Sequence, residues 1–521
     1  MRPAHLLVPL LSLVFLGEAN SAESVPDVCV VWAESLGGER VFWIDGANPA
    51  ARDDGPGTTT APWKTTAAAS RRDLRRGDVV VLRPGTYRGA LRPLGGGLTI
   101  TGCPDAETIV TGSAALRTTW TQDGKDWIAD RYRPMPNYGD RYDPNLILLD
   151  GEPMRPAPDR DSLSVGAFAV WEDAYKSERL VVRLPDGRVP SDFEIEAGVH
   201  AILFGPAGSE ACRDQPDAYP GVTLQNLIFE HAANPAQMGA VCIAGTGAVV
   251  RDVLIRRTNG RGMEMWGTRH TVARVNTSDN GHLGIGGGCV DCLLEDVTAD
   301  RNNWRGHDPY WEAGGGKWVR TTRTVFRNFA AADNDGPGLW LDGDSPNNLI
   351  DGATLSGNLV SGLQIELGSD NTRVVGSHIT GTRRDGWAAE GILVMASSGT
   401  TLERNTLSGN EGSGLWLRMD SRRQTGGISA TGNVFSGNAP VSEGKDYQVR
   451  LEIDALVGGA RPEFLWRDNH LISTRAGHLA GIRPDRDAPV QAVRSASELH
   501  ALLGVDGPTE WVLLPTSSGG R

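Results

Sequence analysis

The sequence predicts an all-β solenoid, a parallel β-helix, because a short segment recurs through the middle of the chain. In each recurrence a glycine opens a short, mostly apolar run, such as GLWLD from Gly338 and GLQIE from Gly362. The opening glycines are spaced by 22, 32, 22, 24, 29 and 23 residues, and they are Gly262, Gly284, Gly316, Gly338, Gly362, Gly391 and Gly414. A second apolar run lies between them, and Asn and Gly gather at the turns. A period of about 23 residues with such corners is typical of a parallel β-helix. The two longest spacings contain insertions at 303–313 and 383–389.

The N-terminus predicts export. Arg2 and His5 precede an apolar run, Leu6–Gly17, and small residues follow it. This run is too short to span a bilayer, so residues 1–22 are predicted to be a secretory signal peptide. We therefore expect a protein that is secreted, extracellular or periplasmic, with no membrane partner.

Residues 23–114 are expected to form an N-terminal cap and the first β-helix coils, with a strand at 41–45 and a short helix within 65–74. The segment Gly77–Tyr87, GDVVVLRPGTY, resembles the first coil of the pectin-lyase-like superfamily of right-handed parallel β-helices. The resemblance covers most of the mature chain and implies the fold. It says little about the reaction, because that superfamily holds lyases, hydrolases, esterases and epimerases.

The rest of the chain divides into segments that follow the repeat and segments that do not. Residues 115–204 do not follow it and are predicted to form an inserted β-rich subdomain. Residues 205–475 carry the β-helix and its active groove. Residues 476–521 are expected to cap the open end, with a helix over 495–503 that begins at Ser495 or Ser497.

Charge and cysteine content limit the partners. Lys plus Arg is 51 and Asp plus Glu is 64, which gives a net charge of −13. This disfavours nucleic acid and, less strongly, polyanionic substrates, and we expect a monomer acting on a polysaccharide or oligosaccharide. The six cysteines suit disulfides in an exported protein, and the sequence leaves their pairing open. For Cys289 and Cys292 we expect a structural role.

Strand alternation separates inward from outward side chains. Positions one and three after each glycine are mainly apolar and are expected to fill the interior. The side chains expected on the outer face include Glu264, Trp266, Trp318, Arg320, Trp340, Asp342, Gln364, Glu366, Trp416 and Arg418. Exposed indoles need a reason, and Trp318, Trp340 and Trp416 are predicted to be platforms for sugar rings beside Gln364. The alternative is that an insertion packs over this face and buries them.

Asp342 and Glu366 are the predicted catalytic pair. They lie 24 residues apart at equivalent positions, so they are expected on neighbouring rungs, about 4.8 Å apart. Retaining glycosidases hold their two carboxyls about 5–5.5 Å apart, so this spacing favours retention. The alternative is a solvated acidic ladder or a structural calcium site that also uses Asp344 and Asp370. The hydrolase interpretation needs no cofactor.

The two strands GLWLD and GLQIE also resemble the β-helical β-xylosidase family of glycoside hydrolases. In that family an Asp in a similar strand is the nucleophile and a Glu one coil later is the general acid/base. The resemblance therefore implies that Asp342 is the nucleophile and Glu366 the acid/base. It covers these two coils well and the rest of the chain only as fold.

Two other functions stay open. The stretch WEAGGGK, residues 311–317, resembles β-helical polysaccharide lyases, which implies Lys317 as base, Arg320 or Arg418 as helper, and Glu312, Asp342 and Glu366 as ligands of Ca²⁺. Lys317 falls at an inward position in our alternation, so this requires a shifted register or a corner. His307, in the first insertion, is a candidate substrate contact. The third interpretation is a non-catalytic carbohydrate-binding or adhesion solenoid.

Overall fold

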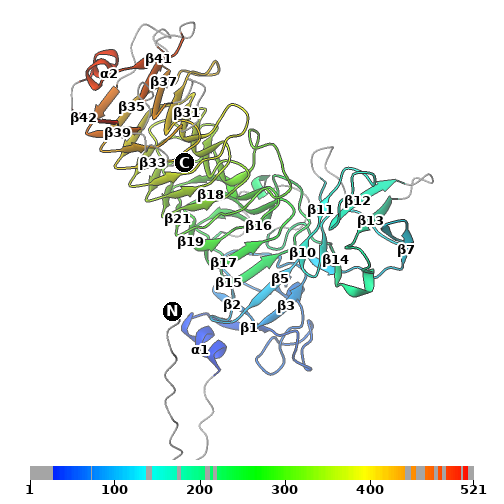
Figure 1. Ribbon diagram of the computed structural model, residues 1–521. Coiled ribbons are helices and arrows are strands. Elements are labelled where there is room, and N and C mark those ends of the chain that lie inside the picture. Colours follow the sequence, from blue (N-terminus) through cyan, green and yellow to red (C-terminus); the bar gives the residue numbers. More distant parts are fainter. Residues whose placement is uncertain are drawn as a thin grey trace, which may run out of the picture.

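The computed structural model describes residues 27–71, 73–135, 143–172, 178–205, 212–214, 220–439, 447–452, 464–473, 479–483, 489–505 and 508–513. The predicted signal peptide, 1–22, lies outside the described residues. Within them the chain is a parallel β-helix, so the predicted fold class is confirmed. Figure 1 shows the solenoid running from β1 and β2 at one end to α2 and β42 at the other, with a subdomain projecting from one side.

Three parallel sheets form the sides of the solenoid. Sheet A contains β1 (Arg40–Ile44), β2 (Asp78–Leu82), β3 (Gly85–Arg88), β4 (Thr99–Gly102), β5 (Thr108–Thr111), β15 (Thr223–Glu230), β17 (Val249–Arg256), β19 (Thr271–Asn276), β21 (Leu293–Glu295), β23 (Val325–Arg327), β26 (Leu349–Asp351), β29 (Arg373–Val375), β32 (Ser398–Glu403), β35 (Gly426–Thr431) and β38 (Phe464–Arg467). Sheet B, which carries the candidate site, contains β16 (Gly239–Thr246), β18 (Arg261–Thr268), β20 (Leu283–Val290), β22 (Gly314–Val319), β25 (Leu339–Asp342), β28 (Ser361–Glu366), β31 (Glu390–Met395), β34 (Leu415–Arg418), β37 (Val449–Glu452), β40 (Ala480–Arg483) and the antiparallel end strand β41 (Gln491–Val493). Sheet C contains β24 (Ala330–Ala332), β27 (Thr354–Ser356), β30 (His378–Thr380), β33 (Thr406–Ser408), β36 (Val434–Ser436), β39 (Asn469–Ser473) and β42 (Thr509–Leu513).

The interior is a continuous apolar core. Leu339 and Leu341 of β25 stack on Leu363 and Ile365 of β28, and all four are fully buried. The inward positions expected from the alternation are therefore confirmed in these coils. Because each coil buries its apolar side chains mainly against its neighbours, the sequence period becomes the period of the core.

The opening glycines and the turn asparagines meet at one corner. Asn302 donates from Nδ2 to Asn334 Oδ1 at 3.0 Å, and Asn334 donates to Asn358 at 2.8 Å, so their amides form a buried ladder. A Cβ on Gly338 would lie 2.6 Å from Asn358 Nδ2. Only glycine lets the strand start this close to the ladder, which explains why the two residue types recur together.

One coil departs from the predicted register. Lys317 pairs with Gly286 on one side and with Trp340 on the other, so it occupies an outward position. Its neighbour Trp318 pairs with Leu341, points into the core and is fully buried. The predictions of Lys317 as inward and Trp318 as an exposed platform are wrong. Three consecutive glycines precede Lys317, and Gly315 rather than Gly316 lies against the asparagine ladder, beside Asn334.

The inserted subdomain lies between 113 and 198, near the predicted bounds 115–204. It has two small, mainly antiparallel sheets with a separate apolar core. Their strands are β6 (Ser113–Ala115), β7 (Trp120–Asp123), β8 (Asp126–Ala129), β9 (Ile147–Leu149), β10 (Glu152–Pro153), β11 (Arg155–Pro156), β12 (Ala167–Glu172), β13 (Glu178–Arg183) and β14 (Ile195–Gly198).

Short helices and disulfides secure the ends. Helix α1 (Val28–Ser35) lies beside β1 and β2, and Cys29 forms a disulfide with Cys103. Helix α2 (Ala496–Leu503) begins at Ser495, whose side chain accepts from the Glu498 N–H, so the predicted C-terminal helix and its cap are confirmed. The other disulfides join Cys212 to Cys242 and Cys289 to Cys292. In the described part of the chain, no helix is long and apolar enough to cross a membrane.

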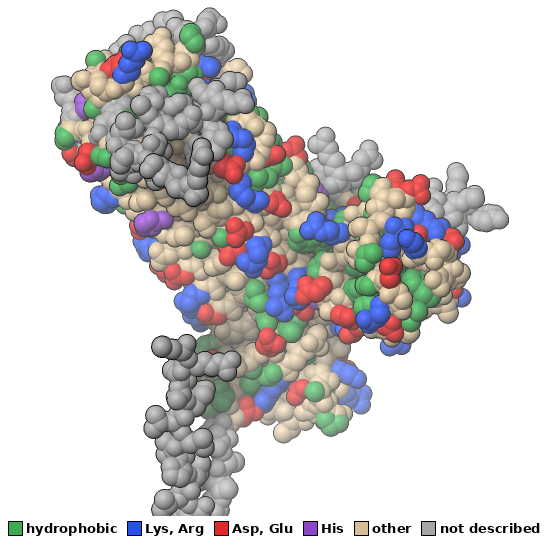
Figure 2. All heavy atoms as spheres, viewed as in Figure 1, with side chains coloured by type: hydrophobic (Ala, Val, Ile, Leu, Met, Phe, Trp, Pro, Cys, Tyr) green, Lys and Arg blue, Asp and Glu red, His purple; other side chains and the backbone are tan. Residues whose placement is uncertain are grey.

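Charged side chains form exposed ladders at the corners of the solenoid. Arg274 binds Asp252 at 2.7 Å and Arg301 binds Asp279 at 2.8 Å, each one coil away, and all four residues have a positive φ. Figure 2 shows such blue and red side chains interspersed over the visible face. We call the pairs Arg274–Asp252, Arg301–Asp279 and Arg323–Asp291 the corner ladder.

Candidate active site

A cavity of about 500 Å³ lies on the outer face of sheet B. Its floor comes from β18, β20, β22, β25 and β28, and its walls come from the segment 303–313 and from residues after β34. It is lined by Arg213, Gln237, Arg261, Glu264, Trp266, Gly287, Tyr310, Trp311, Glu312, Lys317, Val319, Trp340, Asp342, Glu366 and Arg422. The structure therefore brings together Asp342, Glu366, Lys317, Glu312 and Trp340 of the predicted site.

Asp342 and Glu366 occupy adjacent rungs. Leu341 is paired with Ile365, so the next residue along each strand places the Cα atoms of Asp342 and Glu366 one strand spacing apart, about 4.8 Å. Both side chains line the cavity and neither enters the apolar core. Two carboxylates at this spacing repel unless a proton or cations compensate them.

Lys317 compensates Asp342. Its Nζ lies 3.0 Å from Asp342 Oδ2, donates to the Trp311 carbonyl at 2.7 Å and lies 3.4 Å from the centre of the Trp340 ring. The other oxygen, Asp342 Oδ1, accepts the Gly343 N–H at 2.7 Å. Burial lowers the pKa of Lys317 and Asp342 partly offsets that effect. Two donors thus hold Asp342 in one orientation.

Glu366 is held by different partners. Gln364 donates from Nε2 to Glu366 Oε2 at 2.8 Å, and Arg422 binds Oε1. Arg422 also binds Asp420 at 2.9 Å, and its side chain is about half exposed. Gln364, predicted to bind substrate, therefore positions Glu366 and is itself buried.

A second pair of carboxylates lies at the N-terminal end of the cavity. Glu312 binds Arg261 and accepts from Gln237 Nε2 at 2.9 Å. Glu264 accepts from Trp266 Nε1 at 2.7 Å and from the Gly239 N–H at 3.0 Å. Burial lowers the pKa of Arg261. These residues form a rigid polar end wall.

The two predicted insertions meet over the cavity. The Tyr310 hydroxyl donates to the Asp385 carbonyl, and the Tyr310 ring stacks on Trp387 at 5.3 Å. The first insertion is also fixed to the subdomain, because Arg305 Nη1 donates to the Asn145 carbonyl at 3.0 Å. Trp304 packs into an apolar cluster with subdomain residues beside it. The side wall of the cavity thus depends on a part of the chain far away in sequence.

The predicted open indoles are not open. Trp340 and Trp416 are buried, and cations lie over their rings: Lys317 over Trp340, and Arg450 over Trp416 at 4.1 Å. The insertions cover this face, which was the alternative interpretation. The indole that stays exposed nearby is Trp387, at 42%.

Other predicted contacts lie outside the cavity lining. The His307 ring packs edge-on against the buried His282 at 4.8 Å, and burial lowers the pKa of His307 to about 4. Arg320 is exposed and stacks over Trp266 from outside the lining. Arg418 and Trp416 line a separate hollow further along sheet B.

Asp370, one of the two predicted calcium ligands, has other partners. Asp370 binds Arg423 and accepts the Ser398 N–H at 2.8 Å. Within the described ranges, no three His, Cys, Asp or Glu side chains are grouped so that they could hold a metal ion, and this includes Asp344. The geometry therefore gives no support to a calcium site at Asp344 and Asp370.

Several lining residues escaped the sequence prediction. Glu264 and Trp266 stood at outward positions of the same alternation and could have been found from it. Arg422, Gln237 and Arg213 come from loops, where no periodicity marks which side chains turn toward sheet B. The disulfide between Cys212 and Cys242 fixes the loop next to Arg213 against β16.

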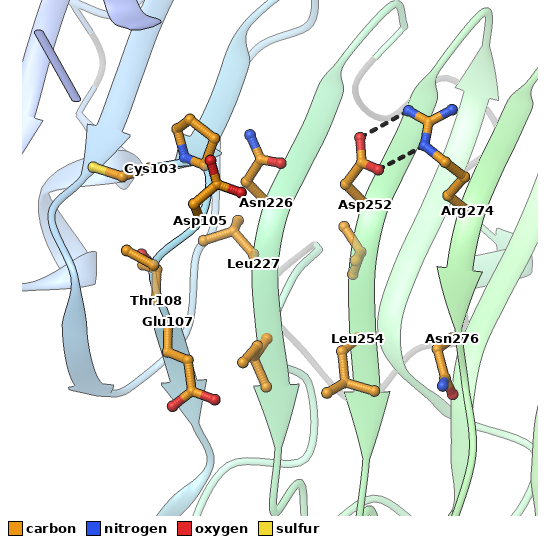
Figure 3. A pocket seen from close by; sticks show the side chains of 14 residues that line it. Cys103, Asp105, Glu107, Thr108, Asn226, Leu227, Asp252, Leu254, Arg274 and Asn276 are labelled. Carbon is orange, nitrogen blue, oxygen red and sulfur yellow. Dashed lines mark hydrogen bonds and ion pairs between the residues drawn. The ribbon is translucent and has the colours of Figure 1, made fainter. Parts of the chain in front are cut away.

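Another hollow, of about 520 Å³, lies on sheet A. Figure 3 shows Asp252 and Arg274 paired across neighbouring strands there, with Asp105 and Glu107 on the adjoining segment. These charged side chains are exposed, and no cation–carboxylate pair is buried among the residues that line it. We therefore place the candidate site on sheet B.

Comparisons with known proteins agree with this architecture. Residues 239–390 match the family model of the right handed beta helix region. No curated protein matches the sequence. Among solved structures, the complex of XylC with xylose has a TM-score of 0.59 and 13% identity, over 92% of this chain and 85% of that one.

Two further similar structures are more distant. The A-module of the Azotobacter vinelandii mannuronan C-5 epimerase AlgE4 has a TM-score of 0.42 and 12% identity, over 92% of this chain and 98% of that one. The pectate lyase Pel9A has a TM-score of 0.36 and 13% identity, over 80% and 76%. The family model and the XylC structure thus agree with a right-handed parallel β-helix fold for this chain.

Proposed function

We propose that the protein is a carbohydrate-active enzyme that hydrolyses glycosidic bonds with retention of configuration. The observation that carries this proposal is the placement of Asp342 and Glu366 on adjacent rungs, both lining one cavity. A backbone spacing of about 4.8 Å lets the two carboxyl groups reach the roughly 5–5.5 Å separation of retaining glycosidases, which is shorter than the roughly 6.5–9.5 Å that inversion needs. XylC, which has the highest TM-score of the three similar structures described above, was solved with xylose bound, and this supports a sugar substrate.

Asp342 is the nucleophile in this mechanism. Lys317 and the Gly343 N–H hold both its oxygens and suit an ionised carboxylate. One oxygen attacks the anomeric carbon while Glu366 gives its proton to the departing glycosidic oxygen, so a covalent glycosyl ester forms and the leaving sugar departs as an alcohol. Water then attacks the ester, Glu366 takes the water proton, and Asp342 is released.

Glu366 must be protonated for the first step. Its Oε1 binds Arg422, an ion pair that has to open before Glu366 can carry the proton. Arg422 has a second partner, Asp420, and a half-exposed side chain. Substrate entry therefore has to move Arg422 toward Asp420, which leaves Glu366 with Gln364.

The lyase interpretation receives less support. It assigns Glu312, Asp342 and Glu366 to a calcium ion, but each of them binds a cationic side chain: Arg261, Lys317 and Arg422. Lys317 donates to two acceptors, as an ammonium does, rather than presenting a free amine. A binding solenoid needs no such pair of adjacent carboxylates.

The three disulfides support export to an oxidising compartment.

A panel of aryl glycosides and polysaccharides tests the proposal with the full chain. We expect new reducing ends, a first product with the anomeric configuration of the substrate by NMR, and no ultraviolet absorbance from unsaturated uronates. Asp342→Ala should lose activity and regain part of it with azide, which replaces the missing nucleophile. The matched control is Asp252→Asn in the corner ladder, which should behave as wild type. Unsaturated products, or inversion, would overturn the proposal.

A further inference from the structure

A second hollow of about 470 Å³ lies on the same face of sheet B, toward its C-terminal end. Strands β34, β37 and β40 and the residues after β34 line it. Arg418, Arg450 and Arg483 face Asp420 and Glu452 there, and Trp416 forms part of the wall. The cations outnumber the carboxylates, in a chain whose net charge is −13.

The hollow is in line with the catalytic pair. Glu366 is paired with Met395, and Met395 with Arg418, so Arg418 lies two rungs from Glu366, about 10 Å along the solenoid. The segment after β34 joins the two sites, because Asp420 lines the hollow and Arg422 lines the cavity. Met395, which lies between them, is 5% exposed, so a linear ligand would reach both by passing over the side chains that cover it.

The three arginines of the hollow have different surroundings among the described residues. Arg450 and Arg483 share Glu452, at 2.6 and 3.8 Å, while Asp420 binds Arg422 of the neighbouring cavity. Arg418 packs over the rings of Trp387 and Trp416, at 4.2 and 5.6 Å. No carboxylate of the described segments lies within ion-pair distance of Arg418. Its guanidinium is thus held by aromatic rings and by the Met395 sulfur at 3.4 Å, and Asp420 acts on it only from beyond ion-pair distance.

Trp416 provides an independent observation. It is 6% exposed, and its Nε1 is buried with no hydrogen-bond partner among the residues described here. Trp416 lines the hollow, and a buried donor without a partner costs free energy that a ligand acceptor within its reach would recover. An indole donor and a guanidinium fork together suit a planar or tetrahedral oxyanion.

We infer that this hollow is a subsite for an acidic sugar residue, whose carboxylate or sulfate binds Arg418. The inference rests on the proposed function, since the rest of the sugar chain would occupy the catalytic cavity. The overall negative charge repels a polyanion, so the fitting ligand is a mainly neutral oligosaccharide with an acidic residue some distance from the cleaved bond.

Calorimetric binding to the Glu366→Gln variant tests this without turnover. The probes are neutral oligosaccharides with xylose, galactose and mannose backbones, each paired with the same backbone bearing one uronic acid or one sulfate. We expect at least one acidic member to bind about tenfold more tightly than its neutral partner, or better. Whether the uronate or the sulfate shows the preference identifies the anion.

Arg418→Gln in that background should remove the preference, and Arg483→Gln should weaken it. Arg274→Gln, in the corner ladder, is the matched control and should keep it. Thermal melting verifies that each variant is folded. Equal affinity for every acidic and neutral pair, or a preference that survives both substitutions in the hollow, overturns the inference. Because binding is measured without cleavage, it stands or falls separately from the hydrolase proposal.

Discussion

The corner ladder and the catalytic cavity contain the same kind of ion pair in opposite surroundings. In the corner ladder, the side chains of Arg274 and Asp252 are 56% and 39% exposed. In the cavity, those of Arg261 and Glu312 are 6% and 11% exposed. Both pairs join side chains contributed by different coils, so strand geometry alone does not separate them.

The two pairs differ in the free energy of hydration that is lost when they form. An exposed pair is screened by water and contributes about 0–1 kcal/mol, so its members are replaceable. A buried pair loses hydration, and its attraction often only balances that loss, so burial of charge is poor evidence for stability. Charges kept in a cavity at such a cost are therefore better explained by chemistry than by folding.

The largest expected difference is in activity. Glu366→Gln removes the proton donor and should lower kcat/KM by about 10²–10⁴-fold on substrates with a poor leaving group. Glu295→Gln is the matched control, because Glu295 also ends a strand and binds an arginine, Arg327, but is only half-buried and lies on sheet A. We expect it to keep wild-type kinetics. Equal losses in both variants would contradict the assignment.

A smaller difference is expected in stability. Arg261→Met leaves Glu312 buried with no cationic partner and should lower the free energy of unfolding by about 3–5 kcal/mol. Arg274→Met in the corner ladder should change it by less than about 0.5 kcal/mol. Urea unfolding followed by circular dichroism measures both. Similar values for the two variants would mean that burial does not distinguish the pairs.

The smallest expected effect is a shift in pH dependence. Burial lowers the pKa of Lys317, so its ammonium loses the proton at a lower pH than an ordinary lysine. Activity that needs this ammonium beside Asp342 falls as the pH rises through that lowered pKa. Lys317→Arg stays charged and should move the alkaline limb of kcat/KM to higher pH.

The contribution of Lys317 to the free energy of unfolding should change with pH in the opposite direction to its contribution to activity. Between the lowered native pKa and the ordinary value of 10.5, the unfolded chain holds more protons, so stability gains from Lys317 as pH rises through this window. That gain should be absent in Lys317→Arg, while Lys64→Arg at an exposed site should retain it. For activity, the contradicting result would be an alkaline limb of kcat/KM that lies at the same pH in Lys317→Arg and in wild type. It would show that catalysis does not require the Lys317 ammonium.

The fold could be predicted because one interaction repeats. Five of the seven opening glycines lie against a turn asparagine, so the two residue types recur at the coil period, and this marked the strands; the five are Gly262, Gly284, Gly338, Gly391 and Gly414. The strand register was predicted wrongly where more than one glycine could open the strand. In Gly314–Gly316 three glycines compete for one position, and a shift of one residue sent Trp318 inside and Lys317 outside.

The candidate site could be predicted only in part. Asp342 and Glu366 lie on regular strands, where alternation decides which way a side chain points. Arg422 and Tyr310 approach the site from loops, and Arg305 acts through a contact with the subdomain. No local sequence pattern therefore predicts that these residues belong to the site. The burial of Trp340 and Trp416 follows from the same loops and was equally invisible to strand periodicity.

The anchoring of Arg305 to the subdomain has a consequence for how such a protein can diversify. The reacting groups belong to the rigid solenoid, whereas one wall of their chamber takes its position from a module inserted more than a hundred residues earlier. Grafting a different module at that point would reshape the chamber while leaving the chemistry in place. New specificities are therefore accessible by exchange of a single block, without rebuilding the scaffold.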